Sequence, residues 1–346
     1  MDRARLLRLL PGLVVSLGFL SWFAWTAEWE RVAESLAGVR LPWVLASAGV
    51  LFSEFFVRTL RWRVLLGPMR TPEGRPPTLK IGRLFVATVV GMSLNVVLPF
   101  RAGDFARPYL GSRETGLPIP PLVTIAVMER VFDILGLVSV LLLMVATLPA
   151  DAAAHGPLVT NLKVYGGIFG IAGMLGLATM IAMAVAREQA RSLFRKLATL
   201  LPGPIQGRVI QLYEGLCDGL EVVRSLRVVG LAMGLSLIHW TGGALSIYLL
   251  FRAFSLDLPF AAAAFTTVAI ALAAALPQAP GFFGVFHAAT EKTLVLWGQA
   301  VDPSKAYAIV LWGVSFIPLA IVGALLFWRE GLKLSELRGT AKVEPT

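Results

Sequence analysis

The chain has 346 residues, of which 57% are hydrophobic and only 15% charged, and its mean hydropathy is +0.75. Soluble domains carry about 25% charged residues, so this composition excludes a soluble enzyme, a disordered protein and a fibrous protein. The net charge is +10, but the basic residues fall between apolar runs, which argues against nucleic-acid binding. The composition predicts an all-α polytopic membrane protein.

Six apolar runs approach or exceed the length of about 20 residues that a helix needs to cross a bilayer. They lie at 9–27, 41–57, 122–148, 164–186, 228–251 and 306–328. Two further runs, 84–98 and 260–276, are shorter. The sequence therefore predicts about six full spans and two segments that need another explanation.

The distribution of basic residues predicts the orientation, because basic loops of membrane proteins face the cytoplasm. Residues 58–83 carry seven basic residues and one acidic residue, and residues 187–227 carry seven basic and four acidic residues. The N-terminus is also basic, whereas the tail 329–346 is only weakly so. We predict a multi-pass protein of the cell inner (cytoplasmic) membrane, with its N-terminus and C-terminus in the cytoplasm.

The two short apolar runs are predicted to be re-entrant hairpins. Because residues 83 and 187 both face the cytoplasm, the spans 122–148 and 164–186 already complete one crossing and its return. The segment 84–121 must then begin and end on the cytoplasmic side. With a cytoplasmic C-terminus, the same count predicts a hairpin at 260–304 that enters from the opposite side.

An internal repeat supports this count. Residues 98–105 and 276–283 share the pattern L-P-x-x-x-G-x-F, about half a chain length apart. The pattern predicts one membrane domain, 1–346, in which repeat one (about 9–148) and repeat two (about 164–328) have opposite orientations. The residues that break the helices at the two tips are Pro99, Gly103, Pro277, Pro280 and Gly281.

Broken helices inside a membrane need a polar or protein-lined setting. Inverted repeats with such breaks are typical of transporters, whose substrates bind near the breaks. We interpret the tips as a binding site; the alternative is a pair of buried kinks. Residues 188–226 carry leucine stripes between basic residues, which predicts cytoplasmic interfacial helices or a helical pair packed under the bundle.

Ionisable residues at membrane depth gather in the first half of the chain, where they are usually functional or paired. The candidate substrate-binding residues there are Asn95, Arg101, Asp104, Arg107, Glu129, Arg130 and Asp133. Their formal charges sum to zero, which favours a mutually paired network. The sharper hypothesis is that Arg101 or Arg107 binds a phosphate, since an arginine fork donates two parallel hydrogen bonds.

Some of these charged residues, and a further pair, also allow a structural interpretation. Glu129 and Arg130 favour a structural role, and Arg130 can pair with Asp133 three residues later. Glu54 and Arg58 are four residues apart and are expected to form a pair at the end of their span.

The second hairpin contributes Gln278 and His287 as candidate substrate-binding residues. His287 is either a proton relay or a hydrogen-bonded packing residue. One cysteine and three widely spaced histidines offer no evident metal site, and no Walker A loop or nucleophile–base arrangement occurs. We expect no enzyme activity, no metal and no cofactor.

Three motifs carry a resemblance to a known family. The stretch 91–107, GMSLNVVLPFRAGDFAR, together with AVMERVFD at 126–133 and LPQAPGFFGVFH at 276–287, resembles the flippase-like family that includes the transmembrane region of lysylphosphatidylglycerol synthases. The resemblance covers roughly residues 10–330. Asp104 stands where that family more often has Glu, Phe282 where many members have Gly, and His287 where many have Glu.

The resemblance implies transbilayer movement of a polar-headed, phosphate-bearing lipid or lipid-linked intermediate. It also implies a stand-alone membrane unit without the soluble aminoacyl-transferase domain of the synthases. The expected partner is a membrane lipid with an anionic or zwitterionic head group. Alternatives are an accessory membrane protein that binds a lipid or a partner without transport, a proton-coupled small-solute transporter, and a membrane enzyme acting on a lipid phosphate.

Overall fold

The computed structural model shows a helical bundle. The residues that it describes are 21–22, 24–97, 103–147, 168, 171–179, 182, 206–207, 210, 221–275 and 280–331. The helices are α2 (Trp29–Ala37), α3 (Leu41–Leu66), α4 (Ile81–Val97), α5 (Gly103–Thr115), α6 (Ile119–Thr147), η3 (Glu221–Arg224), α10 (Leu226–Ala253), α11 (Phe260–Ala275), η4 (Pro280–Phe282), α12 (Val285–Leu296) and α13 (Val301–Arg329). These described residues contain no β-strand, which confirms the predicted all-helical class.

Three of the described helices, α3, α10 and α13, are long and apolar enough to cross a membrane. They have 26, 28 and 29 residues, so each extends about 39–44 Å and exceeds the roughly 30 Å hydrocarbon core. Helix α6 has 29 residues but carries three charged residues in its first half. The predicted spans 9–27 and 164–186 lie largely outside the described residues.

The ends of these helices follow from local sequence. Pro42 lies in the first turn of α3, where a missing backbone N–H costs nothing. Ser225 caps α10, since its side-chain oxygen accepts a hydrogen bond from the backbone N–H of Val228. The start of α3 is also held by a distant part of the chain, since the backbone N–H of Arg40 donates to the carbonyl of Ala253 at 3.0 Å.

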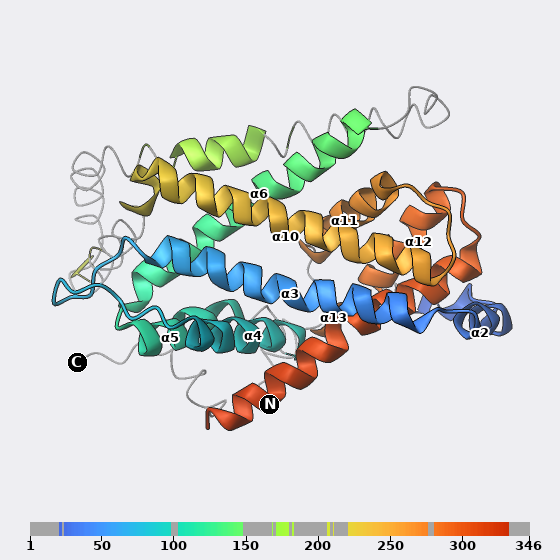
Figure 1. Cartoon of the computed structure of the whole chain (residues 1–346), viewed down its shortest axis with the longest axis horizontal. Coiled ribbons are helices and arrows are strands. Elements are labelled where there is room, and N and C mark those ends of the chain that lie inside the picture. Colours follow the sequence, from blue (N-terminus) through green and yellow to red (C-terminus); the bar gives the residue numbers. More distant parts are fainter. Residues whose placement is uncertain are drawn as a thin grey trace.

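Helices α3 and α10 lie side by side along the long axis of the described bundle, and they run in opposite directions (Figure 1). Buried serines join them: the hydroxyls of Ser47 and Ser246 lie 2.8 Å apart, and each is within hydrogen-bond distance of the carbonyl oxygen of the other residue. The small serine side chains let the two helices approach closely, and their hydroxyl groups find hydrogen-bond partners on the opposite helix, so neither is left unpaired.

Two antiparallel pairs of short helices approach from opposite ends of the bundle (Figure 1). The pair α4–α5 lies at one end, and the pair α11–α12 lies at the other. Each of these four helices has 12 to 17 residues and extends at most about 26 Å, less than the hydrocarbon core. The tip η4 of the second pair packs against α4 of the first.

Glycines allow the first pair to pack closely. A Cβ atom added at Gly103 would lie 1.8 Å from the carbonyl oxygen of Gly91, so only glycine fits there. A Cβ atom at Gly91 would in turn lie 2.9 Å from Cβ of Arg107. The start of α5 therefore lies directly on the backbone of α4, which places the polar residues of both helices side by side.

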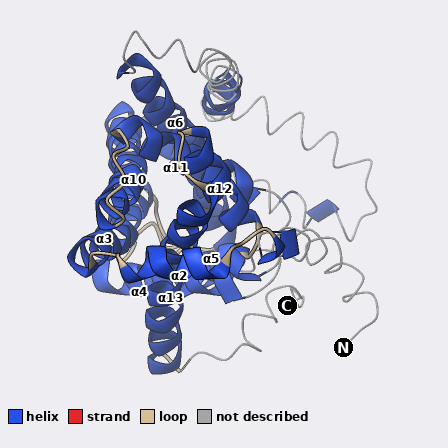
Figure 2. Cartoon of the chain, turned by 90° about the vertical axis from the view of Figure 1, so that its right-hand side faces the viewer, coloured by secondary structure: helices blue, strands red, loops and turns tan. Residues whose placement is uncertain are grey.

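The order of contacts between consecutive helices is the same in the two halves of the chain. In the first half α3 contacts α4, α4 contacts α5, and α5 contacts α6. In the second half α10 contacts α11, α11 contacts α12, and α12 contacts α13. Across the halves, α13 contacts α4 and α3, while α6 contacts α11 and α10 (Figure 2).

Candidate functional site

A cluster of charged side chains lies where α3, α10, α6 and the α4–α5 pair converge. It contains most of the polar residues that the sequence analysis selected in the first half of the chain. It also contains Arg58 and Arg61 from α3 and His239 and Ser236 from α10, which that analysis did not select. We call this set, with Glu54, the charge network.

Arg61 lies at the centre of the charge network. Its side chain is 1% exposed, and its Nη1 atom donates hydrogen bonds of 2.7 Å to both Asp133 Oδ1 and Ser236 Oγ. Its Nε atom lies 3.7 Å from Glu129 Oε1. One arginine of α3 thus joins α6 and α10.

Arg107 forms a bidentate ion pair with Glu129. The Nη1 atom lies 2.6 Å from Oε2, and the Nη2 atom lies 3.2 Å from Oε1. The guanidinium also lies over the ring of Trp62, 4.3 Å from its centroid. The pair joins α5 to α6, and the indole of α3 covers the charge with an aromatic face.

His239 connects two further members. Arg58 donates from Nε and Nη2 to His239 Nε2, at 3.1 and 2.8 Å, and Glu54 Oε2 lies 3.1 Å from His239 Nδ1. Because arginine only donates, Nε2 must be the acceptor and the ring is neutral with its proton on Nδ1. The pair expected between Glu54 and Arg58 is therefore replaced by contacts that both residues make with His239.

The edge of the charge network is its most exposed part. The Asn95 amide donates to Asp104 Oδ1 at 2.8 Å and accepts from the Asp104 backbone N–H at 3.1 Å. Arg130 Nη2 donates to the same Asp104 oxygen at 3.1 Å, and its Nη1 lies 3.7 Å from Asp133. The side chains of Arg130 and Asp104 are 44% and 32% exposed, against 14% or less for the other charged members.

The charge network is electrically balanced. Its four arginines are Arg58, Arg61, Arg107 and Arg130, and its four carboxylates are Glu54, Asp104, Glu129 and Asp133. Balance lowers the cost of removing charges from water, as the sequence analysis predicted for the smaller set. The predicted contact between Arg130 and Asp133 is present at 3.7 Å.

Several buried atoms of the charge network have no hydrogen-bond partner in the described protein. They are Glu54 Oε1, Arg61 Nε and Nη2, Arg107 Nε and His239 Nδ1, the last of which lies 3.1 Å from Glu54 Oε2 without hydrogen-bond geometry. Buried polar groups are normally satisfied by protein, ordered water or a ligand. Within the described residues, Arg61 and Arg107 therefore keep buried N–H groups that have no hydrogen-bond acceptor.

The positions of Arg58 and Arg61 correct the predicted loop 58–83. The sequence analysis ended a span at residue 57 and counted both arginines as cytoplasmic. In the structure α3 continues to Leu66, and both side chains face the interior of the bundle. The spacing of three residues, which places both on one helical face, was the available signal. The five remaining basic residues still outnumber Glu73.

The second hairpin tip is aromatic instead of charged. His287 is buried on α12 between aromatic rings, and it stacks on Phe283 and Trp312. Trp312 Nε1 of α13 donates a 2.7 Å hydrogen bond to the carbonyl of Gly281, where φ is +79°. Gly281 thus adopts a backbone conformation that suits glycine, and α13 anchors the tip.

Not every candidate residue can be placed. Pro99, Arg101, Pro277 and Gln278 lie outside the described residues, and Pro280 begins η4. His287 lies apart from the charge network, on the other helix pair. Among the residues that the structure describes, no group of three or more His, Cys, Asp or Glu side chains is arranged to hold a metal ion.

Comparison with known proteins identifies the family. The sequence profile described as the lysylphosphatidylglycerol synthase TM region matches residues 9–323. The chain belongs to this family. It is a helical membrane protein, as its composition predicted, and the resemblance seen in its three motifs is confirmed. No solved structure matches the chain.

Similar members of the family come from archaea. A UPF0104 membrane protein of Methanocaldococcus jannaschii is 26% identical over 240 residues, 68% of this chain and 94% of the relative. A UPF0104 membrane protein of Methanothermobacter thermautotrophicus is 24% identical over 311 residues, 86% of this chain and 83% of the relative. Glycosyltransferase AglD of Haloferax volcanii is 26% identical over 282 residues, 74% of this chain but only 43% of the relative.

Proposed function

We propose that the protein translocates a polar-headed, phosphate-bearing lipid or lipid-linked intermediate between the leaflets of the cytoplasmic membrane. The observation that carries the proposal is the charge network, in which single N–H groups of the buried Arg61 and Arg107 have no hydrogen-bond partner among the described residues and a partly exposed ion pair lies at the edge. A polar head group can reach such donors from the edge while its acyl chains stay in the bilayer. The family name supports a lipid setting, since it refers to a phospholipid synthase.

The edge and the interior of the charge network have different roles in this proposal. The contact between Arg130 and Asp104 is partly exposed to solvent, so a phosphate can replace the carboxylate at little cost. The Arg107–Glu129 pair is buried, and separating it would leave an uncompensated charge. We therefore assign the exchange with a lipid phosphate to Arg130, with Arg107 Nε and Arg61 as further donors. Arg101 stays a predicted phosphate ligand.

We also infer that the fold consists of two inverted repeats, with the hairpins α4–α5 and α11–α12 in equivalent positions. The matching sets of helix contacts support this inference. Glu54 and His239 support it as well, because each lies thirteen residues after the first residue of its helix. Two equivalent positions in contact are expected on a two-fold axis, which would pass between these residues in the membrane plane.

Movement of the hairpins against the long helices would expose the charge network to one leaflet and then the other. This mechanism requires no covalent chemistry, and we propose that the chain does not alter its lipid. The N-terminus, the loop before α4 and the C-terminus would face the cytoplasm, as the basic loops predict.

Reconstitution tests the proposal. The purified protein is placed in liposomes, and a head-group-labelled phosphatidylglycerol in the inner leaflet is followed by an impermeant quencher. We expect faster loss of protected label than in protein-free liposomes or in liposomes with an unrelated helical membrane protein. Translocation would be rejected if liposomes with and without the protein lost the label at equal rates, both for phosphatidylglycerol and for a series of other phosphate-bearing lipids.

The second candidate is a membrane protein that binds a lipid for a partner enzyme and moves nothing. One relative is named a glycosyltransferase, and this chain covers only 43% of it. The matched 43% of that relative would then be a membrane region that serves an enzymatic domain in the remainder of the relative. Saturable lipid binding without acceleration of transbilayer movement, in the same liposomes, would select this candidate.

A further inference from the structure

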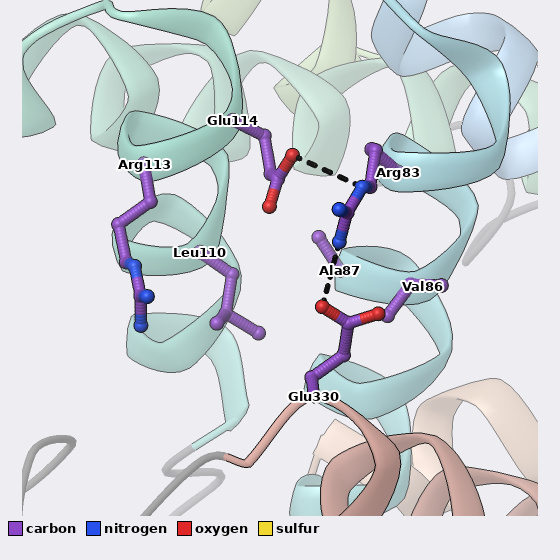
Figure 3. A pocket seen from close by; sticks show the side chains of 7 residues that line it. All are labelled: Arg83, Val86, Ala87, Leu110, Arg113, Glu114 and Glu330. Carbon is purple, nitrogen blue, oxygen red and sulfur yellow. Dashed lines mark hydrogen bonds and ion pairs between the residues drawn. The ribbon is translucent and has the colours of Figure 1, made fainter.

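Two adjoining cavities flank Arg83 where the first turn of α4 meets the end of α13. One is an open groove between α4 and α13, lined by Lys80, Gly82, Arg83, Val86, Leu326, Arg329 and Glu330. The other lies between α4 and α5, and Figure 3 shows Leu110 and Ala87 on its floor and Arg113 at its rim. We call the first cavity the α4–α13 groove.

The α4–α13 groove has a basic rim and an apolar wall. Arg83 is 51% exposed, and it is bound by Glu330 at 2.7 Å and by Glu114 at 3.7 Å (Figure 3). Lys80 and Arg329 are exposed, and no carboxylate in the described part of the chain lies within ion-pair distance of either. With Glu330 as the one acidic residue lining it, the groove has a formal charge of +2.

The last turns of α13 project beyond the described bundle in Figures 1 and 2. They expose Ile321, Leu325 and Trp328 on the face that points away from α4, while Leu326 faces the groove. A tryptophan beside a terminal arginine is typical of a helix end at the membrane–water interface. In the groove itself, Val86 and Leu326 lie beside Lys80 and Arg329, two cations without an ion-pair partner among the described residues. Apolar side chains next to such cations match the chemistry of one phospholipid molecule, with its phosphate bound by the cations and its acyl chains against the apolar side chains.

We infer that the α4–α13 groove is a docking site for an anionic phospholipid of the cytoplasmic leaflet. Lys80 and Arg329 bind the phosphate, and Val86 and Leu326 contact the first part of an acyl chain. Glu330 competes with that phosphate for Arg83. The inference rests on the proposed function, which places this end of the bundle at the cytoplasmic leaflet. It also deepens that function, because α4 leads from Lys80 in the groove to Asn95 at the edge of the charge network, about 22 Å away.

Native mass spectrometry of the full-length protein in detergent tests the inference with palmitoyl-oleoyl phosphatidylglycerol as the probe. The double variant Lys80→Gln/Arg329→Gln should weaken its binding about tenfold or more, since each basic residue near an anionic lipid contributes appreciably. The control is Arg63→Gln/Arg75→Gln, which removes two exposed arginines from the same end of the bundle. It should leave binding unchanged.

A variant that is expected to strengthen lipid binding controls for misfolding, because a misfolded protein would only lose binding. Glu330→Gln removes the competing carboxylate and should strengthen phosphatidylglycerol binding severalfold. Equal losses in the double variant and its control would overturn the inference, and so would equal binding of phosphatidylcholine. Displacement of the lipid by millimolar inorganic phosphate would assign the groove to a soluble anion and would also overturn it.

The two proposals fail in distinguishable ways. If the wild-type protein binds phosphatidylglycerol in the groove but moves no lipid, translocation is wrong and the docking site stands. If translocation is observed while the Lys80→Gln/Arg329→Gln variant binds phosphatidylglycerol normally, the docking site is wrong and translocation stands.

Discussion

Arg107 and Glu129 form a bidentate ion pair in the interior of the bundle, with hydrogen bonds of 2.6 and 3.2 Å. The pair fixes the returning helix of the first hairpin against α6, and Trp62 covers its arginine. Because both Nη atoms are occupied, the hairpin is held at this point while its tip lies next to the more exposed Arg130 and Asp104.

The Arg107–Glu129 pair is expected to behave as a stability element. Glu129→Gln and Arg107→Met each leave a buried charge without its partner, so each should lower the free energy of unfolding by about 3–5 kcal/mol. The double variant should be less destabilised than the sum of the two single variants. Thermal unfolding in detergent measures all four proteins.

A simple additive result would show that the two side chains do not interact strongly. Arg31→Met provides a control, because Arg31 contacts Glu28 and Asp302 at an exposed position. Its loss should change stability by less than about 1 kcal/mol.

The exposed edge of the charge network should affect transport more than stability. Arg130→Gln removes the group that we assign to phosphate exchange, and it should reduce the initial rate of lipid movement at least about tenfold. Its melting temperature should stay close to that of the wild type, because the side chain is partly solvated. Rates come from the liposome assay, and melting is followed on the same preparation.

The conservative variant Arg130→Lys keeps the charge but not the planar fork, so it should restore only part of the rate. Full activity of a well-folded Arg130→Gln protein would remove Arg130 from the mechanism. The donors at Arg61 and Arg107 would then be the next groups to test.

The glycine contact between α4 and α5 predicts a strong steric effect. Gly103→Ala would place Cβ 1.8 Å from the carbonyl oxygen of Gly91, so α5 must shift and the protein should lose several kcal/mol of stability. The matched control is Gly230→Ala in α10, where no atom lies within 4 Å of the added Cβ. That variant should be neutral or slightly more stable, since alanine favours helix. Similar melting of the two variants would contradict this packing.

The inverted arrangement predicts which loops face each side of the membrane. After replacement of Cys217 by serine, single cysteines are introduced as Arg75→Cys, before α4, and as Asp257→Cys, between α10 and α11. An impermeant maleimide should label position 257 in intact cells and position 75 only after the inner membrane is opened. Labelling of both positions from one side would refute the parity that makes 84–121 a hairpin.

Much of the candidate site was visible in the sequence because charged residues are rare in apolar helices. Glu129, Arg130 and Asp133 stand out in a run of hydrophobic residues, and Asp104 and Arg107 follow a short helix. All of them belong to the charge network. The cost of burying an isolated charge makes such a set predictable, since unpaired members would be expelled or neutralised.

Arg58, Arg61 and His239 were not predictable in the same way. The first two lie next to other basic residues, and the rule that assigns basic loops to the cytoplasm averages over the whole segment. Only the length of α3, which continues to Leu66, places them inside. His239 joins them because α10 runs antiparallel to α3, and that pairing connects residues almost two hundred positions apart.

Composition and hydropathy are enough to predict a helical membrane protein with charges gathered in the first half of its chain. These properties follow from the energetic cost of polar groups in hydrocarbon. The pairing of each arginine with its carboxylate, the N–H groups left without an acceptor among the described residues, and the exposure of the Arg130–Asp104 pair become visible only in the packed helices. Those outcomes depend on where three helices and a hairpin converge, and distances between helices are not encoded in any local pattern.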